Sequence, residues 1–429
     1  MRIFLDTIGC RLNQSEIESI ANTFRALGHQ VVGEPAEADL AIVNTCAVTV
    51  KAAADSRKQL RHAARAGAGK VIATGCWATL YPEDALTLEG VSGVYLNDQK
   101  DGIVADLLGL PSEDVTGLPL VREPLPGDRA RTRAFIKVQE GCDNHCTYCL
   151  TRLARGKSHS RSLMEVRRDI DAALAGGTKE VVLTGVELGA WGRDFDPGLT
   201  LYDLIEGVLQ NPALRRLRLS SIEPWDFELR ILDLWQDERL CHHLHIPLQA
   251  GNDRILHAMG RPITKAAFAG LIEQIRNTIP DVALTTDVIA GFPGETDDDF
   301  QATRNYIQRI GFSGGHVFTY SPRPGTAAYK MKDRPEPSLA KARNAELRQV
   351  FHELGNTYRN QFVGENLDVL WESSEPLENG SWRLSGLTSN YIRVFAQSEV
   401  DRWNEVTRVK IAGENAKRNG LDGQIIAGI

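Results

Sequence analysis

Three cysteines lie close together in one short segment: Cys142, Cys146 and Cys149. Their C-x3-C-x2-C spacing allows three thiolates to bind three irons of a 4Fe–4S cluster, which normally takes four cysteines. The remaining iron is then open to a substrate or cofactor. The alternatives are zinc, for which His145 can supply the fourth ligand of a tetrahedral site, and a redox dithiol. The spacing and the position directly after a predicted strand favour the cluster.

The other four cysteines are dispersed: Cys10, Cys46, Cys76 and Cys241. Each of the first three follows the carboxyl end of a predicted strand, where ligands gather in open parallel sheets. We therefore expect these three to meet in space; the alternative is an unrelated buried cysteine at each strand end. The odd total of seven cysteines argues against a disulfide framework. Cys241 matches no motif and is predicted to be a buried free thiol.

Alternating strand and helix patterns surround these residues. Residues 1–112 follow a β-α-β-α-β order, which predicts a parallel sheet with helices on its faces. Residues 113–131 are rich in Pro, Gly and charge and are expected to form a linker. Residues 132–361 alternate six apolar strands with helices, which predicts an incomplete or full βα barrel. Residues 362–429 change to short strands with Gly and Asn turns, typical of a small OB-like β-barrel. The fold class is therefore α/β with a small all-β domain at its end. The six barrel strands are expected at Ala134–Val138, Val181–Thr184, Leu217–Ser220, Leu244–Pro247, Ala283–Ala290 and Gly315–Phe318.

The net charge of −7 excludes a protein that binds nucleic acid through bulk basicity. An RNA partner would have to meet a local patch, and one basic run is a candidate, with a solvated helix face plus loop as the alternative. The apolar runs are too short for a transmembrane helix. Asp6 interrupts any signal-peptide core, so no membrane association and a cytoplasmic location are expected. The basic run contains Arg152, Arg155, Lys157, Arg161, Arg167 and Arg168.

The triad motif after the first barrel strand resembles the radical S-adenosylmethionine superfamily. In that superfamily the open iron binds the amino and carboxylate groups of the cofactor, and reductive cleavage yields a 5′-deoxyadenosyl radical. The resemblance implies that Cys142, Cys146 and Cys149 are catalytic cluster ligands. It also implies that Tyr148 lies against the adenine, with simple loop packing as the alternative for this residue.

The layout of the whole chain resembles the methylthiotransferases, which join an N-terminal three-cysteine domain, a radical domain built as a (βα)6-type partial barrel, and a C-terminal TRAM domain. The segments around Cys10, Cys46 and Cys76 are similar to the three cysteine motifs of that family. This resemblance implies a second 4Fe–4S cluster on these three residues, with an open iron where sulfur can attach. The cofactors are thus two 4Fe–4S clusters and S-adenosylmethionine.

The resemblance also implies cofactor contacts at the ends of later barrel strands. Glu187 departs from the family pattern, so its role stays open. For Ser221 and Glu223 the alternatives are a helix cap and a solvated acid. Arg323, at the end of the sixth strand, is expected to face the substrate or the sulfur pathway, and Arg161 to face the substrate. The expected cofactor contacts are Tyr148, Thr184, Gly185, Val186, Glu187, Ser221, Glu223 and Gln249.

Three substrate groups exist within the methylthiotransferases: isopentenyladenosine in tRNA, threonylcarbamoyladenosine in tRNA, and an aspartate of a ribosomal protein. The motifs around Cys10 and Cys46 and the segment Leu219–Pro224 resemble the threonylcarbamoyladenosine group most. This implies insertion of a methylthio group at C2 of the modified adenosine at position 37, beside the anticodon. The expected partners are the tRNA anticodon loop and a flavodoxin- or ferredoxin-type electron donor; the sulfur donor is unknown.

The alternatives are the other two substrates, or a non-enzyme iron–sulfur protein that binds RNA or transfers electrons. Residues 364–425 contain ten acidic and seven basic residues, a balance that favours the ribosomal-protein alternative, since RNA-binding domains usually carry excess positive charge. A local face of the C-terminal barrel could still contact tRNA. Its expected members are Arg383, Tyr391, Arg393, Arg408 and Lys410.

Overall fold

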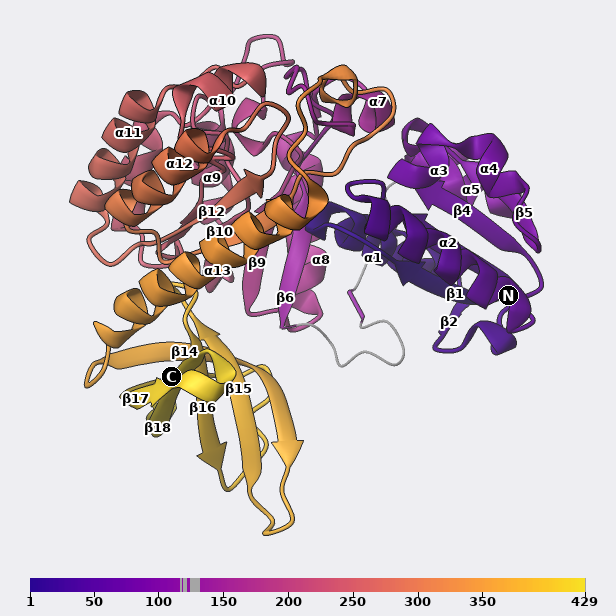
Figure 1. Ribbon diagram of the computed structural model, residues 1–429. Coiled ribbons are helices and arrows are strands. Elements are labelled where there is room, and N and C mark those ends of the chain that lie inside the picture. The colour runs from indigo at the N-terminus through magenta and orange to yellow at the C-terminus, as the bar shows by residue number, and fades with distance from the viewer. Residues whose placement is uncertain (116–117, 119–121, 124–131, 429) are drawn as a thin grey trace. The chain divides into compact units, whose positions relative to one another are not determined.

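The computed structural model describes residues 1–115, 118, 122–123 and 132–428, and the chain divides into two compact units (Figure 1). Most of the predicted linker 113–131 lies outside the described residues. The predicted boundaries at 112, 131 and 361 stay a prediction. Unit 1 comprises Met1–Thr178, Leu183–Leu199 and Arg323–Thr326, and unit 2 comprises Lys179–Val182, Thr200–Pro322 and Ala327–Ile429.

Unit 1 contains a five-stranded parallel sheet in the order β2-β1-β3-β4-β5. The predicted strands β1, β3 and β4 are confirmed and are adjacent. The prediction missed β2, which is three residues long, and β5, whose apolar pattern is interrupted by Ser92 and Gly93. The strands are β1 (Arg2–Thr7), β2 (Gln30–Val32), β3 (Leu40–Thr45), β4 (Val71–Gly75) and β5 (Val91–Tyr95).

Helices cover both faces of this sheet, because its strands are apolar on both sides. One face packs on α1 (Arg11–Ala26) and α5 (Ile103–Leu108), which share a core with Ile3 and Leu5 of β1. The other face packs on α2 (Val50–Arg65), α3 (Cys76–Leu80) and α4 (Pro82–Leu86). The apolar residues of α1 recur at helical spacing and are buried, and the helix ends before Gly28, which has φ +79°.

The rest of unit 1 begins with β6 (Arg133–Lys137) and β7 (Gln139–Glu140) and continues through the triad loop into α7 (Thr151–Arg155). A short strand, β8 (His159–Ser160), pairs antiparallel with β7. The next helix, α8 (Leu163–Ala175), starts at a capping box formed by Ser162 and Glu165. Helix α1 also packs against β6, and the Lys137 backbone N–H donates to Ser15 Oγ at 3.0 Å. The triad loop therefore lies in the same unit as the three dispersed cysteines.

The predicted barrel strands are all present. They form two three-stranded sheets, β10-β9-β6 and β11-β12-β13, and parallel bridges link Leu217 to Leu240 and Ser221 to His245. This is an incomplete βα barrel. Residues 180–182 of β9 belong to unit 2 and 183–184 to unit 1. The remaining strands are β9 (Glu180–Thr184), β10 (Arg216–Leu219), β11 (His243–His245), β12 (Ala283–Ala290) and β13 (Gly314–Thr319).

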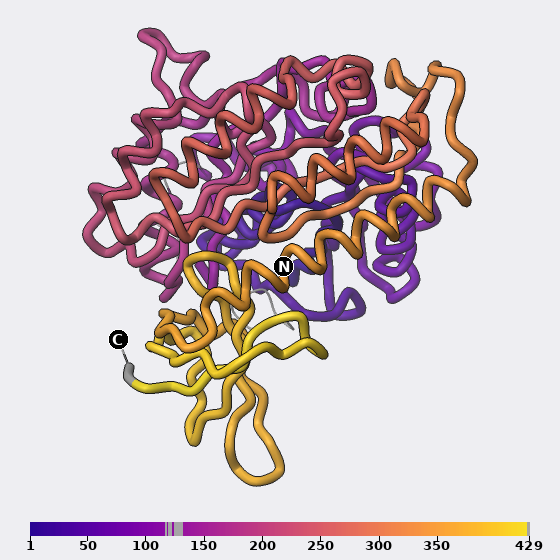
Figure 2. The backbone as a smooth tube through the Cα atoms, turned by 60° about the vertical axis from the view of Figure 1, so that its left-hand side comes forward, coloured from indigo at the N-terminus to yellow at the C-terminus, as the bar shows by residue number. Residues whose placement is uncertain are grey.

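Helices connect the barrel strands, as predicted, and Leu229–Gln236 forms a 3-10 helix. A 24-residue helix, α13 (Pro337–Asn360), packs on β12 and β13 and leads to the C-terminal barrel (Figure 2). In the described part of the chain, no helix is both long and apolar enough to cross a membrane. The connecting helices are α9 (Leu201–Leu209), α10 (Asp253–Ala258), α11 (Lys265–Thr278) and α12 (Asp297–Ile310).

The C-terminal strands form a closed barrel in the order β14-β15-β16-β18-β17, which confirms the predicted small β-barrel. Its core surrounds the fully buried Trp371, whose indole N–H donates to Thr407 Oγ1 at 2.9 Å. The prediction missed β18, whose glycine-rich sequence lacks a clear alternating pattern. The strands are β14 (Asn366–Pro376), β15 (Trp382–Thr388), β16 (Arg393–Ser398), β17 (Val406–Asn415) and β18 (Gly420–Gly428).

Candidate functional site

The three dispersed cysteines gather at the carboxyl edge of β1, β3 and β4. Cys10 is the N-cap residue of α1, Cys46 follows β3 and is buried, and Cys76 is the first residue of α3. Gly9 has φ +115°, and a Cβ added there would lie 2.7 Å from Cys46 Sγ, so the backbone before Cys10 passes directly against that thiol. The geometry expected from the strand order is therefore present, and a set of soft thiolate donors suits iron–sulfur ligation.

Burial and the charges of neighbouring thiols both affect the pKa of Cys46. Burial raises the pKa of Cys46 to about 11, and the negative charges of Cys76 and Cys10 add to this effect. Cys10 Sγ lies 3.6 Å from Asn13 Oδ1. Asn13 is itself fixed, because its amide donates to the carbonyls of Ile8 at 2.8 Å and Thr45 at 3.1 Å. The thiols thus sit on a rigid frame of buried backbone and amide groups.

The triad loop folds back on itself between β7 and α7. The Cys142 N–H donates to Gly156 O at 3.2 Å, and the Cys149 N–H donates to Cys146 O at 3.1 Å. All three thiols are partly exposed. Tyr148 lies half-buried in the same turn, while His145 is exposed and contacts Arg152. Three thiols converge in one accessible loop, which suits a cluster with an open iron.

Glu187 holds this loop in place. Its buried carboxylate accepts from the Asp143 N–H at 3.2 Å and from the Asn144 side-chain amide. Together with burial, the Glu187 charge raises the pKa of Cys142. The Glu187 N–H in turn donates to Gln139 Oε1 at 2.8 Å. Glu187, whose role the sequence left open, therefore positions the triad loop.

Gln139 joins the end of β9 to the triad loop. Its amide donates to Glu140 O, Gly141 O and Ser158 Oγ at 2.8–3.0 Å. Thr184 O accepts from the Val138 N–H at 2.9 Å, which brings the predicted cofactor residues 184–187 beside the loop. Their contacts to a cofactor stay a prediction.

We expect Gly141→Ala to distort the triad loop. Gly141 has φ +71°, and an added Cβ would lie 1.8 Å from Lys157 O, so the backbone must move. The variant should lose up to about four irons per chain after reconstitution, measured by iron analysis. Gly156→Ala is the matched control, because Gly156 has φ +73° with no atom within 4 Å of its added Cβ. Equal iron contents in the two variants would contradict the steric argument.

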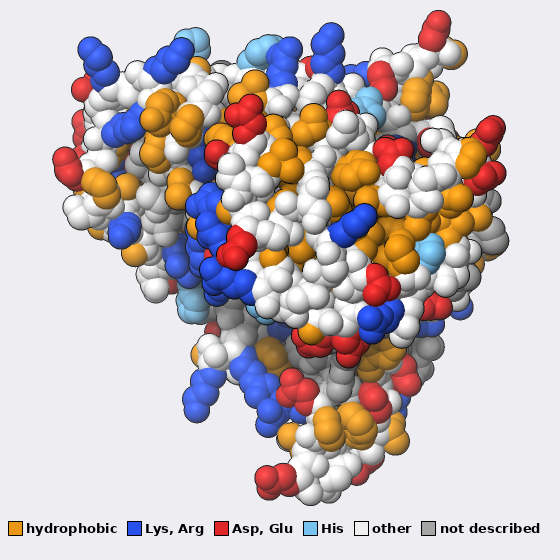
Figure 3. Space-filling view, turned by 90° about the vertical axis from the view of Figure 1, so that its right-hand side faces the viewer, with side chains coloured by type: hydrophobic (Ala, Val, Ile, Leu, Met, Phe, Trp, Pro, Cys, Tyr) orange, Lys and Arg blue, Asp and Glu red, His pale blue; other side chains and the backbone are white. Residues whose placement is uncertain are grey.

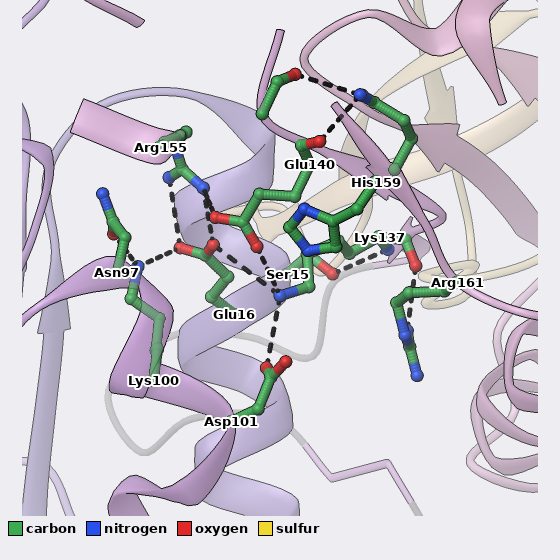
Figure 4. A network of polar contacts seen from close by, with 12 residues as sticks. Ser15, Glu16, Asn97, Lys100, Asp101, Lys137, Glu140, Arg155, His159 and Arg161 are labelled. Atoms are coloured by element: carbon green, nitrogen blue, oxygen red, sulfur yellow. Dashed lines mark hydrogen bonds and ion pairs between the residues drawn. The ribbon is translucent and has the colours of Figure 1, made fainter. Parts of the chain in front are cut away.

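A buried charged network connects the two cysteine sets within unit 1 (Figure 4). Arg155 is buried and bonds Glu16 at 2.8 Å and Glu140 at 2.5 Å. Lys100 bonds Glu16 at 2.6 Å, and Lys137 bonds Glu140 at 2.9 Å. Although burial opposes ionisation, these cations hold the pKa of Glu16 well below its usual range.

Two members of the basic run, Arg155 and Arg161, have partners within the protein. Arg155 is not available to RNA, because internal acids and amides occupy its guanidinium. Arg161, predicted to face the substrate, is paired with Asp169 at 2.7 Å and donates to Lys137 O at 2.8 Å. Helical and loop positions alone could not reveal these partners.

Arg323 belongs to unit 1 and lies near the N-terminal cysteines. It is 8% exposed, and its Nε has no hydrogen-bond partner among the described residues. Burial lowers the pKa of Arg323, while the charges of Tyr81 and Cys46 act in the opposite direction. A position near Cys46 is compatible with the predicted role of Arg323 in the sulfur pathway, and that role stays a prediction.

Three predicted cofactor residues lie in unit 2. Ser221 forms a bridge to His245. Glu223 is ion-paired with the buried Arg261 at 2.7 Å, so it is not a freely solvated acid. Gln249 has φ +69°, and its backbone bridges to Val288 of β12. Cys241 is buried, with its Sγ 3.9 Å from Glu180 Oε2, as expected for a structural thiol.

Unit 2 also brings together His245, Asp287 and His316 on three adjacent parallel strands. The Asp287 carboxylate lies 3.3 Å from His245 and 3.2 Å from His316. Although burial opposes ionisation, hydrogen bonds from both rings hold the pKa of Asp287 well below its usual range. These donor types suit a divalent metal, and they equally suit a carboxylate held between two imidazoles. The sequence motifs did not point to this grouping, because strand register creates it.

The predicted basic face of the C-terminal barrel is largely neutralised. Arg393 pairs with Glu372 at 2.7 Å, Arg408 with Asp368 at 2.8 Å, and Arg383 approaches Glu375 at 3.8 Å. Tyr391 stacks on His243, with ring centroids 4.3 Å apart. Cross-strand acids therefore offset most of the positive charge that composition suggested there.

The sequence reasoning missed several residues that support the thiols: Asn13, Glu16, Asn97, Lys100, Gln139 and Asn144. Asn13 and Glu16 lie in the segment around Cys10 that resembles the first cysteine motif, and Asn144 lies in the triad segment. The others are ordinary polar residues whose importance depends on distant partners. Asn97, for example, donates to Ala154 O at 2.6 Å.

Comparison with family models gives two matches. Residues 136–307 match the radical SAM superfamily, and residues 2–96 match the uncharacterized protein family UPF0004. Each set of three cysteines falls within one of these matched regions.

Curated relatives match almost the full chain. Threonylcarbamoyladenosine tRNA methylthiotransferase MtaB of Thermotoga maritima is 36% identical, covering 92% of this chain and 90% of the relative. The MtaB protein of Bacillus subtilis is 32% identical, covering 94% and 92%. The tRNA-2-methylthio-N(6)-dimethylallyladenosine synthase of Thermodesulfovibrio yellowstonii is 29% identical, covering 99% of both.

A solved structure has a similar fold. The radical S-adenosylmethionine methyltransferase TsrM from Kitasatospora setae, with cobalamin and a [4Fe-4S] cluster bound, gives a TM-score of 0.56 at 15% identity. The match covers 76% of this chain and 73% of that one. At this identity the likeness supports the fold alone.

Proposed function

Because this chain belongs to the family of radical S-adenosylmethionine tRNA methylthiotransferases, we propose that it inserts a methylthio group at C2 of N6-threonylcarbamoyladenosine at position 37 of tRNA. The observation that carries the proposal is the presence of two separate three-cysteine sets in one compact unit. A single set would serve radical formation alone. The second set provides the place for sulfur.

Cys142, Cys146 and Cys149 would hold one 4Fe–4S cluster, and Cys10, Cys46 and Cys76 the other. When bound, the clusters and S-adenosylmethionine supply radical formation, the methyl group and the sulfur attachment point. Three thiolates per set leave one iron of each cluster open. The residues of both sets fit this use: Cys142, Cys146 and Cys149 lie partly exposed in one loop, and Cys10, Cys46 and Cys76 lie at the ends of adjacent strands, where the Gly9 backbone passes against Cys46.

The protein's own residues orient these sites. Glu187 and Gln139 fix the triad loop through hydrogen bonds to Asp143, Asn144 and Gly141. Asn13 holds the backbone of Ile8, before Cys10, and of Thr45, before Cys46. We expect residues 184–187 and Tyr148 to bind S-adenosylmethionine beside the triad. Contacts of Ser221, Glu223 and Gln249 with the cofactor stay a prediction.

The substrate adenosine must leave its stack in the anticodon loop to reach a radical site. Although the chain is acidic overall, Lys and Arg side chains gather in a compact patch on the face shown in Figure 3, and such a patch favours phosphate contact. A tRNA substrate implies a cytoplasmic location. The electron donor would be a flavodoxin- or ferredoxin-type protein.

Nucleoside mass spectrometry tests the substrate. A strain lacking this gene should lose 2-methylthio-N6-threonylcarbamoyladenosine and accumulate the unmethylthiolated nucleoside, and expression of the chain should restore the product. The expected loss is complete, since the unactivated C2 position does not react without a radical. Unchanged product would exclude the proposed substrate. Loss of methylthio-isopentenyladenosine, or of methylthio-aspartate in a ribosomal protein, would assign the chain to those substrates.

A further inference from the structure

Arg155 contacts both buried acids of the charged network, Glu16 and Glu140, and the thiol of Cys76. It ends α7, the helix that follows the triad loop, and its side chain is 2% exposed. Its Nε–H donates to Cys76 Sγ at 3.3 Å. Its terminal nitrogens donate to Glu16 at 2.8 and 3.3 Å, to Glu140 at 2.5 Å and to Asn13 at 2.6 Å.

These contacts use all five N–H donors of the guanidinium. The side chain is therefore fixed, and one of its five N–H groups is directed at sulfur. Asn13, which Arg155 also holds, lies against Cys10 Sγ at 3.6 Å. A single arginine from the segment after the triad thus positions residues at two of the three N-terminal cysteines.

The charge balance of the network supports a role toward a bound anion. Three buried cations, Arg155, Lys100 and Lys137, face two buried acids, Glu16 and Glu140. The further acid on Lys137, Asp101, is 86% exposed and screened by solvent. The buried part of the network thus carries one positive charge in excess, and Arg155 is its member that bonds Cys76. An oxidised 4Fe–4S core held by three thiolates carries about one net negative charge, which this surplus would offset.

We infer that Arg155 is a positioning residue for the N-terminal cluster: its N–H to Cys76 and its buried charge stabilise the reduced form of that cluster. The inference rests on the proposed function, since it requires a cluster on Cys10, Cys46 and Cys76. Hydrogen bonds to cluster sulfurs and local net charge both set the reduction potential. A purely structural arginine would affect folding and leave the potential unchanged.

The test uses the full chain with Cys142, Cys146 and Cys149 replaced by alanine, so that only the N-terminal cluster remains. The cluster is reconstituted, titrated with dithionite and followed by electron paramagnetic resonance. Arg155→Met should shift the midpoint potential to more negative values by at least tenfold in the reduction equilibrium, about 59 mV for one electron. Arg155→Lys keeps the charge but loses the Nε–H, so its shift should be smaller.

Lys100→Met is the matched control. It removes a cation from the same network, and its contacts are Glu16, Asn97 and Asn44 rather than a thiol. Its shift should be smaller than that of Arg155→Met. Should Arg155→Met not fold, Arg155→Met/Glu16→Gln takes its place in the titration, because it also removes one of the two acids that Arg155 pairs. Equal potentials in the parent, Arg155→Met and Arg155→Lys proteins would overturn the inference, as would equal shifts for Arg155 and Lys100.

The two levels of the proposal fail differently. If the parent protein without the triad binds no cluster, the assignment of Cys10, Cys46 and Cys76 falls, and with it the proposed function. If the cluster forms and its midpoint potential does not change when Arg155 is replaced, only the inference about Arg155 is refuted.

Discussion

Replacement of Cys142, Cys146 and Cys149 by alanine is expected to reduce the formation of 5′-deoxyadenosine from S-adenosylmethionine to background. The reductive cleavage requires an iron that these three thiolates hold, and no other cysteine belongs to the triad loop. We expect a loss of roughly 10³-fold or more, about 4 kcal/mol of barrier. Chromatography of the reduced, reconstituted protein with S-adenosylmethionine measures the product, and iron content should fall from about eight to about four per chain.

Cys241→Ala is the control for this experiment. Cys241 is buried in unit 2 with Glu180 as its neighbour, so its removal should cost about 1 kcal/mol of stability and leave iron and cleavage unchanged. Single replacement of Cys142 should have the same outcome as the triple variant. A Cys142→Ala protein that still forms 5′-deoxyadenosine would refute the radical assignment.

Replacement of Cys10, Cys46 and Cys76 should separate the two halves of the reaction. We expect the variant to retain about four irons per chain and to continue forming 5′-deoxyadenosine, because the triad loop and its supports Glu187 and Gln139 are intact. The methylthio product should disappear, since the place for sulfur is gone. Incubation with unmodified substrate tRNA, followed by nucleoside mass spectrometry, measures both products in one sample.

Comparison of the two triple variants separates radical formation from sulfur delivery. Product formed by the Cys10/Cys46/Cys76 variant at the parental rate would show that these cysteines do not deliver sulfur. Loss of 5′-deoxyadenosine as well would show that the first set is needed for the triad to function. The charged network gives a physical route for such a dependence, because Arg155 joins Cys76 to the segment after the triad.

Spacing and periodicity along the chain predicted much of the fold. Apolar runs located β1, β3, β4 and the barrel strands, and helical spacing located α1 and α8 through α13, except for one 3-10 segment. These elements are set by local patterns, in which each residue's neighbours in sequence decide its conformation. The short β2 and the glycine-containing β5 and β18 were missed because their strand form depends on pairing with distant strands.

The sequence by itself determined which residues carry the chemistry: the tight triad, and three cysteines that follow adjacent strands. Only the tertiary structure decided what holds them. In the sequence Arg155 is one member of a basic run. In the folded protein it is buried against Glu16, Glu140 and Cys76. In the sequence Glu187 departs from the family pattern. In the folded protein its carboxylate accepts a hydrogen bond from the triad loop. The physical reason is that a thiol's type and spacing are local properties, whereas a buried charge is defined by partners that lie far away in sequence.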